Sequence, residues 1–257
     1  MKICIAIAVS LMLVCALSLS CLAEGDALSW YCTRNKEHRQ PVLGPDLAFA
    51  EQMGAYYVDR AHSEESGERV VYLTFDAGYE NGNVARILDT LADKQVSGAF
   101  FILGNLIRKN PELVRRMADE GHLVCNHTLT HADMSAVGDL EAFKAELCAL
   151  ESLYLECTGR ELSRYFRPPE GRFCADTLRY AQQLGYKTIF WSFAYEDWKN
   201  DKQMSAEAAK KKIMDNVHNG AIILLHPTSD TNAAVLGEVI DLLREQGYSF
   251  GSLDALR

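Results

Sequence analysis

The sequence of 257 residues has an ordinary globular composition, with 24% charged and 48% hydrophobic residues and a formal net charge of −9. This length allows one large domain, and α/β barrels of about 200–250 residues are common single units. The net negative charge argues against nucleic acid or an anionic membrane surface as a partner, because both would repel the protein.

The N-terminal segment differs in kind from the rest of the chain. Lys2 precedes an almost unbroken apolar stretch over 3–19, and the small-residue segment 20–23 follows it. This pattern is typical of a secretory signal peptide cleaved after Ala23, with an uncleaved membrane anchor as the alternative. No later segment is long and apolar enough to cross a bilayer. We therefore expect an exported protein with no stable membrane insertion once residues 1–23 are removed.

Five cysteines follow residue 23: Cys32, Cys125, Cys148, Cys157 and Cys174. An odd, widely spaced set in a chain of this size is not typical of a disulfide framework. The sequence has no close CxxC pair, which argues against zinc ligation by cysteine. We expect most of the five to be small buried side chains.

Residues 24–69 are polar and irregular, and we interpret them as an N-terminal extension packed on the domain that follows. From residue 70 onward, short apolar runs alternate with amphipathic patterns. The runs predict strands at 70–76, 97–103, 122–127, 164–168, 187–193, 221–226 and 248–253. The patterns predict helices at 83–94, 111–120, 139–157, 175–184, 205–218 and 232–246. This alternation indicates a parallel α/β fold in a single domain.

Unusual polar residues follow the ends of these predicted strands. They are Asp76, His127 with His131, Arg167, Asp197 with Trp198, and His226. In a parallel barrel the carboxyl ends of the strands share one face, where active sites are built. His127 and His131 are four residues apart, a spacing that suits one divalent ion if the turn between them is helical. Taken singly, each residue also fits a structural role, such as a capping Asp76 or a core His226.

The ordered set of short motifs is more specific than its members. The motifs TFDAG (74–78), HTLTH (127–131), FRPP (166–169), EDW (196–198) and ILLHP (223–227) resemble, in order and spacing, the five motifs of the polysaccharide deacetylase superfamily. The resemblance covers residues 70–255, so residues 70–257 would be the catalytic domain. It implies metal-dependent carbohydrate deacetylation by a distorted (β/α) barrel of about seven or eight parallel strands.

Three longer segments, TFDAGYENGN, WYCTRNKEHRQP and FWSFAYEDW, resemble one branch of this superfamily. That branch is the peptidoglycan N-acetylmuramic acid deacetylases of spore-forming bacteria, whose product feeds muramic δ-lactam formation in the spore cortex. The resemblance therefore implies an exported enzyme of the cell wall or spore cortex, with peptidoglycan glycan strands as its partner.

The resemblance also implies a role for each matching residue. Asp76 matches the general base that takes a proton from the attacking water, and Arg167 matches the arginine that holds this base. His127 and His131 match the two metal-binding histidines, and His226 matches the general acid that protonates the departing amine. These roles fit the chemistry of amide hydrolysis, in which water is activated, the carbonyl is polarised and the amine is protonated.

Further matching residues would bind the sugar. Pro168, Pro169 and Trp198 match the walls of the sugar groove, and the backbone N–H near Glu170 matches part of an oxyanion hole. Asp197 lies beside Trp198 in the sequence and is counted with this substrate-binding group.

Two positions depart from the usual pattern of the superfamily. Most members carry a second acid at the position of Ala77, which completes the metal site with the two histidines. Without it, we expect a divalent ion, with zinc as first choice, to bind weakly or atypically, with Asp76, water or substrate as further ligands. Many members also carry an acid at the position of Ala194, which orients the general-acid histidine. Either Asp197 substitutes for that acid or His226 lacks a carboxylate partner.

Three functions remain open. The leading one is removal of N-acetyl groups from muramic acid in peptidoglycan strands already stripped of peptide, with Arg172 and Lys199 as candidates for recognising the lactyl group. A related alternative is deacetylation of N-acetylglucosamine in chitin or peptidoglycan, or hydrolysis of an O-acetyl ester. The alternative from another class is a non-catalytic glycan-binding module, which only Ala77 favours.

Overall fold

The computed structural model describes residues 26–33 and 37–256, so the leader expected at residues 1–23 lies outside the described residues. An eight-stranded sheet forms its centre, and every pairing in this sheet is parallel. The strands in spatial order are β10 (Ser249–Phe250), β3 (Val70–Ala77), β4 (Ala99–Ile102), β5 (Leu123–Asn126), β6 (Ser163–Phe166), β8 (Lys187–Ile189) and β2 (Ala55–Tyr56). The eighth strand, β9 (Ala221–Leu225), is not part of this order and also pairs with β3, along residues 71–75.

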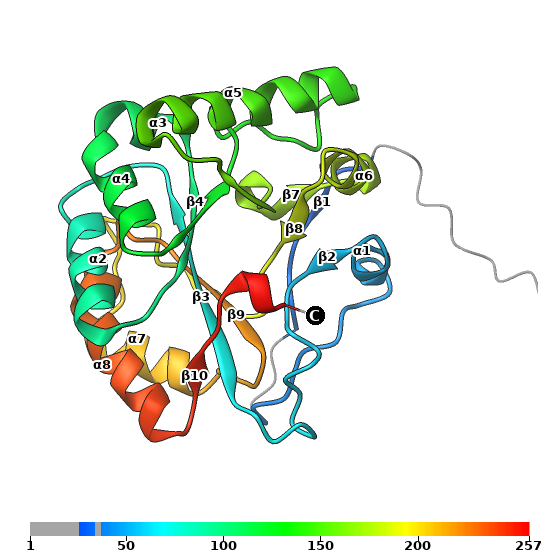
Figure 1. Ribbon diagram of the computed structural model, residues 1–257. Helices are drawn as coiled ribbons and strands as arrows, with labels where there is room; N and C mark the ends of the chain where they lie inside the picture. The colour runs from blue at the N-terminus through cyan, green and yellow to red at the C-terminus, as the bar shows by residue number, and fades with distance from the viewer. Residues whose placement is uncertain (1–25, 34–36, 257) are drawn as a thin grey trace, which may run out of the picture.

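The sheet curls into a distorted, open barrel (Figure 1). After β8 the chain leaves its partners and runs beside β9, where the Ser192 N–H donates to Ile222 O (3.0 Å) and the Leu224 N–H donates to Phe193 O (2.9 Å). These bonds join the segment that follows β8 to β9, which lies at the opposite side of the sheet. The expected α/β fold, a distorted parallel barrel in one domain, is confirmed.

Eight α-helices occur in the described residues, and α2, α4, α7 and α8 lie along the outside of the sheet (Figure 1). They are α1 (Ala48–Gln52), α2 (Asn83–Lys94), α3 (Gly104–Lys109), α4 (Pro111–Asp119), α5 (Leu140–Thr158), α6 (Ala175–Gln183), α7 (Ala206–Met214) and α8 (Asp230–Glu245). Helix α2 illustrates why they form: its buried residues Val84, Ile87, Leu88 and Leu91 recur at helical spacing and give one apolar face to the sheet.

Strand β3 places the chemistry inside the barrel because successive side chains of a strand point to opposite faces. The odd-numbered residues from 71 to 77 pack in the apolar cluster between the sheet and the helices. Of the even-numbered residues, Tyr72 belongs to the interior cluster, and Thr74 and Asp76 both accept hydrogen bonds from Arg167. The strand thus becomes polar on its interior face as it approaches its carboxyl end.

The interior cluster supports the polar layer. It combines alternate residues of the strands with side chains from the C-terminal segment: Tyr72, Ala99, Phe101, Cys125, Tyr165, Ile189, Ile222, Leu253 and Leu256. The Arg167 guanidinium carbon lies 4.1 Å from the centroid of the Phe101 ring, so this arginine rests directly on the cluster. The barrel is therefore a packed core capped by charged groups at one end.

The segment that precedes residue 70 is more structured than the sequence indicates. In it, β1 (Leu28–Ser29) pairs antiparallel with β7 (Arg172–Phe173), and β2 joins the edge of the main sheet. The Trp30 ring stacks on Phe190 with 4.1 Å between ring centroids, which packs this segment against the barrel. Strands of two residues are too short to produce a periodic pattern, and this is why they were not expected.

Other expectations need correction. Helix α3 was not expected, β8 ends at Ile189 rather than at residue 193, and residues 127–131 are not helical. Only Cys125 and Cys174 of the five described cysteines are buried, and all five are free thiols. Among the described residues, no helix combines the length and apolarity needed to span a bilayer.

Candidate active site

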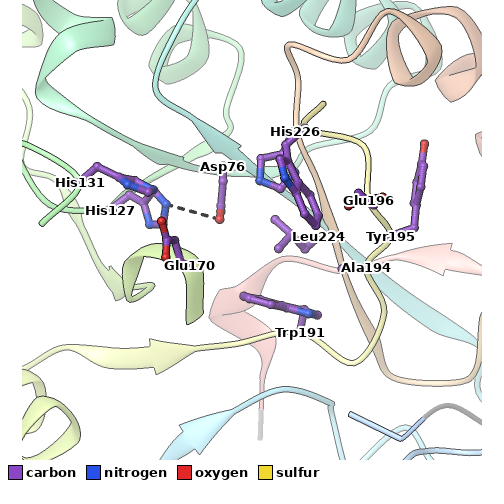
Figure 2. A pocket seen from close by; sticks show the side chains of 11 residues that line it. Asp76, His127, His131, Glu170, Trp191, Ala194, Tyr195, Glu196, Leu224 and His226 are labelled. Carbon is purple, nitrogen blue, oxygen red and sulfur yellow. Dashed lines mark ion pairs between the residues drawn. The ribbon is translucent and has the colours of Figure 1, made fainter. Parts of the chain in front are cut away.

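A cleft of about 670 Å³ opens at the carboxyl ends of the strands. Its lining comes from the ends of β3 and β9 and from loops that follow several different strands: Asp76, His127, His131, Glu170, Trp191, Ala194, Tyr195, Glu196, Trp198, Leu224 and His226. Figure 2 shows Asp76 between the two histidines His127 and His131 on one side and His226 on the other. The polar residues that follow separate strands in the sequence therefore meet in one place.

Asp76 is held by a buried arginine. Arg167 Nη1 donates to Asp76 Oδ1 at 2.7 Å, and the Arg167 side chain is fully buried. Burial raises the pKa of the Asp76 carboxyl, but the positive charge of Arg167, with His127 and His226, lowers it by more, so that the pKa lies below its ordinary value. The carboxylate is therefore ionised at neutral pH.

Arg167 is fixed by four acceptors in total. Besides Asp76, its Nε donates to Ile189 O (3.0 Å), and its Nη2 donates to Thr74 Oγ1 (2.9 Å) and Phe190 O (3.2 Å). Thr74 Oγ1 in turn donates to the Ile223 carbonyl at 2.8 Å. A buried guanidinium needs partners on all sides, and these contacts leave Arg167 one orientation, with its charge directed at Asp76.

His127 is presented to the cleft as a neutral imidazole. Its Nδ1–H donates to the Arg167 carbonyl at 2.8 Å, which leaves the lone pair on Nε2, 3.5 Å from Asp76 Oδ2 (dashed in Figure 2). Burial lowers the pKa of His127 to about 4, although the Asp76 carboxylate opposes this effect. A neutral ring with an anchored Nδ1–H is the form in which histidine binds metals.

The two histidines meet without a helical turn. Thr128 and His131 have φ angles of 73° and 64°, and the His131 N–H donates to Thr128 Oγ1 at 2.9 Å. This tight turn brings the His127 and His131 rings together, with their centroids 5.2 Å apart and their planes at 73°. The sequence required a helical turn to bring the two rings together, and this requirement was wrong. The two rings are nevertheless close to each other.

The donors here fit a divalent metal ion only in part. Two imidazoles and the Asp76 carboxylate are ligands that zinc and similar ions accept. Within the described residues, however, no group of three or more histidine, cysteine or acidic side chains is already arranged as a metal cluster. Ala77 is fully buried in the cluster between sheet and helices and does not line the cleft. The site therefore offers an incomplete shell, with positions left for water or substrate.

His226 has a carboxylate partner. Its Nδ1–H donates to Asp197 Oδ1 at 2.7 Å, and its backbone N–H donates to Asp197 Oδ2 at 2.8 Å. Burial lowers the pKa of His226, but the hydrogen bond and charge of Asp197 raise it by more, and the net effect is upward. The question left by Ala194 is thus answered, because Asp197 supplies the acid that this position lacks.

A second layer holds Asp197. The Asn232 side-chain amide donates to Asp197 Oδ2 at 2.6 Å and to the His226 carbonyl at 3.1 Å. The Tyr195 hydroxyl donates to Asn232 Oδ1. Both Asp197 and Asn232 are buried, so the three hydrogen bonds of the Asp197 carboxylate are shielded from water. The histidine and its carboxylate form one rigid unit.

The residues expected to bind sugar divide into two groups. Trp198 is 52% exposed and lies edge-on to the His226 ring, and Glu170 lines the cleft in a tight turn with a φ of 57°. Pro168 and Pro169 are buried and do not line the cleft. Asp197 is 2% exposed and accepts a hydrogen bond from His226, so it lies behind this histidine and does not line the cleft.

Other residues of the site carry no signal in the sequence. Trp191 and Tyr195 line the cleft but lie within an apolar run that is also typical of core, and Asn232 lies on a long helix far along the chain. Neither candidate for lactyl recognition lines the cleft: Arg172 pairs with Asp133, and Lys199 pairs with Glu196, which does line it. Only its hydrogen bonds to Asp197 and to the His226 carbonyl connect Asn232 with the site.

Comparison with known proteins places this cleft in a family. Residues 63–189 match the polysaccharide deacetylase family. An uncharacterised 30.6 kDa protein of Geobacillus stearothermophilus is 40% identical over 92% of this chain and 88% of its own length. The peptidoglycan-N-acetylmuramic acid deacetylase PdaA of Bacillus subtilis is 36% identical over 90% of this chain and 86% of its own length.

Solved structures agree with the sequence comparison. The structure of Bacillus subtilis PdaA, a family 4 carbohydrate esterase, has a TM-score of 0.85 and covers 91% of this chain and 98% of that chain. A family 4 carbohydrate esterase from Bacillus anthracis, 36% identical, has a TM-score of 0.71 and covers 87% and 98%. The chain therefore belongs to the polysaccharide deacetylase family, a family of metal-assisted carbohydrate deacetylases.

Proposed function

We propose that this protein is an exported hydrolase that removes the N-acetyl group from N-acetylmuramic acid in peptidoglycan glycan strands. One observation carries the proposal: a single cleft contains a carboxylate held by a buried arginine (Asp76 with Arg167) and a histidine held by a buried carboxylate (His226 with Asp197). A base and an acid in one cleft serve hydrolysis, whereas a module that only binds sugar needs neither.

Asp76 acts as the general base. Arg167 occupies its Oδ1 and keeps the pKa of the carboxyl low, which leaves Oδ2 to accept a proton from the attacking water. The oxygen of this water bonds to the acetamide carbon. The fixed Arg167 keeps Asp76 Oδ2 in one place. We expect this positioning to accelerate the reaction more than a higher pKa of the Asp76 carboxyl would.

His226 acts as the general acid. Because Nδ1–H is committed to Asp197, Nε2 is the nitrogen that carries the transferable proton. The carbon–nitrogen bond breaks as this proton reaches the sugar nitrogen, so the amine leaves neutral and acetate remains. Asp197 raises the pKa of His226, and this keeps a larger fraction of the imidazole protonated at neutral pH.

His127 and His131 are the residues that would hold the divalent ion, with water or substrate completing the shell and zinc as first choice. When bound, the ion supplies Lewis-acid polarisation of the acetamide carbonyl and makes water more acidic. The neutral state of His127 favours binding, whereas the buried Ala77 adds no ligand. We therefore expect a weak or atypical site. The Glu170 N–H is the proposed donor to the carbonyl oxygen, and Trp198 the proposed sugar-stacking surface.

The choice of muramic acid in peptidoglycan rests on similarity to PdaA over 90% of this chain. The leader expected at residues 1–23 from the sequence would direct export, and a peptidoglycan substrate supports a location in the cell wall or spore cortex. A role in muramic δ-lactam formation during sporulation is proposed from the motif resemblance alone. This role is a proposal about the pathway, and the chemistry of the cleft is independent of it.

Deacetylation of N-acetylglucosamine is the second candidate, and one observation favours it. Among the described residues that line the cleft there is no lysine or arginine, while Glu170 and Glu196 add two acids. Lys199 lies outside this lining and is already paired with Glu196, so a free lactyl carboxylate on muramic acid meets no unpaired cation of the described lining. N-Acetylglucosamine is neutral and needs none.

Mass spectrometry of defined glycans distinguishes these functions. Residues 24–257 are incubated with peptide-free peptidoglycan strands and, separately, with chitooligosaccharides, each with and without a metal chelator. The proposal predicts acetyl loss from the muramic residues only, and prevention of that loss by the chelator. An Asp76→Asn variant serves as control and is expected to remove turnover.

Each other result has a definite meaning. Acetyl loss from the glucosamine residues would move the protein to the second candidate. Loss that persists with the chelator would contradict a metal-assisted reaction. If neither glycan loses acetyl even with added zinc, but both still bind, a glycan-binding module would replace the enzyme as the preferred function.

A further inference from the structure

Trp30 is a buried residue of the N-terminal segment that has no assigned role. It follows β1 directly, and it precedes residues 63–189, the part of the chain that matches the family. The pairing of β1 with β7 places it next to the turn that carries Glu170, because β7 begins at Arg172 (Figure 1). A segment outside the matched part of the chain therefore reaches a turn that lines the catalytic cleft.

Trp30 holds this turn directly. Its backbone N–H donates to the Gly171 carbonyl at 2.9 Å. Glu170 and Gly171 have φ angles of 57° and 65°, and a residue other than glycine keeps such a conformation only where its surroundings fix it. A Cβ atom placed on Gly171 would lie 2.9 Å from Trp30 Cβ and 2.8 Å from the Trp191 ring. The turn is therefore packed between two tryptophans, and Trp30 closes its outer side.

The same residue also holds the segment that follows β8. Trp30 Nε1–H donates to the Trp191 carbonyl at 2.9 Å, and the Trp30 ring stacks on Phe190 with 9° between the ring planes. The Cys32 thiol is a second donor to the Trp191 carbonyl, at 3.5 Å. Burial raises the pKa of this thiol to about 12, which keeps its hydrogen in place. Residues 190 and 191 are thus fixed from the side of the N-terminal segment.

Both of these segments take part in the site. Glu170 and Trp191 line the cleft (Figure 2), and the Glu170 N–H is the proposed donor to the carbonyl oxygen. The Phe190 carbonyl accepts from Arg167 Nη2 at 3.2 Å and so helps to orient the arginine that holds the base. Donors that stabilise a transition state act only when they are held within tenths of an ångström of their place. Trp30 fixes two such segments at once.

We propose that Trp30 is a positioning residue of the active site, which fixes the turn of Glu170 and the cleft wall at Trp191. The catalytic cleft is then complete only when the N-terminal segment 26–33 is docked on the barrel. The proposal rests on the proposed function and deepens it, because it assigns part of the site's geometry to a segment outside the matched part of the chain. A Trp30 with a structural role alone would affect stability and leave the turnover of the folded protein unchanged.

The test measures kcat and KM of the full protein on peptide-free glycan strands, at a temperature where circular dichroism shows every variant folded. Trp30→Ala removes the ring and its N–H, whereas Trp30→Phe keeps a ring to stack on Phe190. Leu47→Ala, at the start of α1, removes buried packing from the same apolar cluster and serves as control. We expect kcat to fall about 100-fold in Trp30→Ala and about tenfold in Trp30→Phe, with KM little changed, because the Glu170 N–H acts in the transition state. Leu47→Ala is expected to keep the wild-type kcat.

A second readout does not depend on turnover. The chain has three tryptophans, so incorporation of 5-fluorotryptophan gives one fluorine NMR resonance for each. Trp30→Phe is expected to shift or broaden the Trp191 resonance and to leave that of exposed Trp198 unchanged, and Leu47→Ala is expected to change neither. A wild type without deacetylase activity would overturn the proposed function, and the fluorine comparison would still decide the positioning. An unchanged Trp191 resonance, an unchanged kcat in Trp30→Ala, or an equal loss of kcat in Leu47→Ala would refute the proposal.

Discussion

Replacement of Asp197 by asparagine tests whether this carboxylate sets the acid chemistry of the cleft. Asp197 accepts from His226 Nδ1–H on one oxygen, and from the His226 N–H and the Asn232 amide on the other. Asparagine has almost the same shape, but one of its two terminal atoms is a donor. It can satisfy the two donors at Oδ2 only by turning its NH₂ group toward His226 Nδ1. The imidazole must then carry a lone pair on Nδ1 instead of a hydrogen.

This change of tautomer disfavours the protonated ring. Burial lowers the pKa of His226, while Asp197 raises it by more; the variant keeps the burial and loses the carboxylate, so the pKa falls. A hydrogen bond to a charged group contributes about 1.5–3 kcal/mol, which corresponds to a loss of about 10- to 150-fold in kcat/KM. The expected decrease is smaller than for removal of His226 itself, because the ring remains in place.

The assay is the pH dependence of kcat/KM on peptide-free glycan strands. Since a general acid must be protonated, activity is lost as pH rises through the pKa of His226, and in Asp197→Asn this loss is expected at lower pH. Asp201→Asn, the same chemical change at an exposed site four residues away, serves as control and is expected to follow the wild type. An unshifted alkaline limb would refute the reasoning. A uniform decrease at every pH would indicate structural damage instead.

Three further changes test the rest of the site. Asp76→Asn is expected to abolish turnover. It is also expected to lower the free energy of unfolding in urea by about 3–5 kcal/mol, because it leaves the buried Arg167 cation without its anion. An unchanged free energy of unfolding would contradict this pairing. Titration of zinc, cobalt and manganese is expected to give a site-specific heat of binding that His127→Ala removes, and a heat that survives would place the metal elsewhere. Ala77→Asp is expected to lower the thermal midpoint without tightening zinc binding, because position 77 lies in an apolar cluster. Tighter zinc binding with unchanged melting would refute that placement.

The sequence allows much of this arrangement to be predicted, because periodicity and strand ends carry it. The predicted helix at 83–94 agrees with α2, since four buried apolar residues and the glycine before it define that element. Asp76, His127 and His226 could be grouped in advance because each follows an apolar run, and parallel strands bring their carboxyl ends to one face. These are local patterns that global geometry then combines.

The remainder depends on contacts that no local pattern encodes. Asp197 resembles a groove residue in the sequence, and only its distances to His226 and Asn232 identify it as the partner of the acid. Pro168 and Pro169 follow Arg167 in the sequence and resemble groove walls. In the structure they are buried and do not line the cleft. Which face of a turn reaches a cleft is decided by tertiary packing, and the spacing of residues does not determine it.

The retained charge pairs argue against a protein that only binds glycans. Asp76 pairs with buried Arg167 and His226 pairs with buried Asp197, and such pairs contribute little net stability because desolvation offsets their attraction. A binding module gains nothing from them and would be more stable with apolar residues in their place. Ala77 does not weaken this argument, because β3 continues through it and its side chain packs behind the strand. The departure at position 77 thus leaves Asp76 and His226 in place.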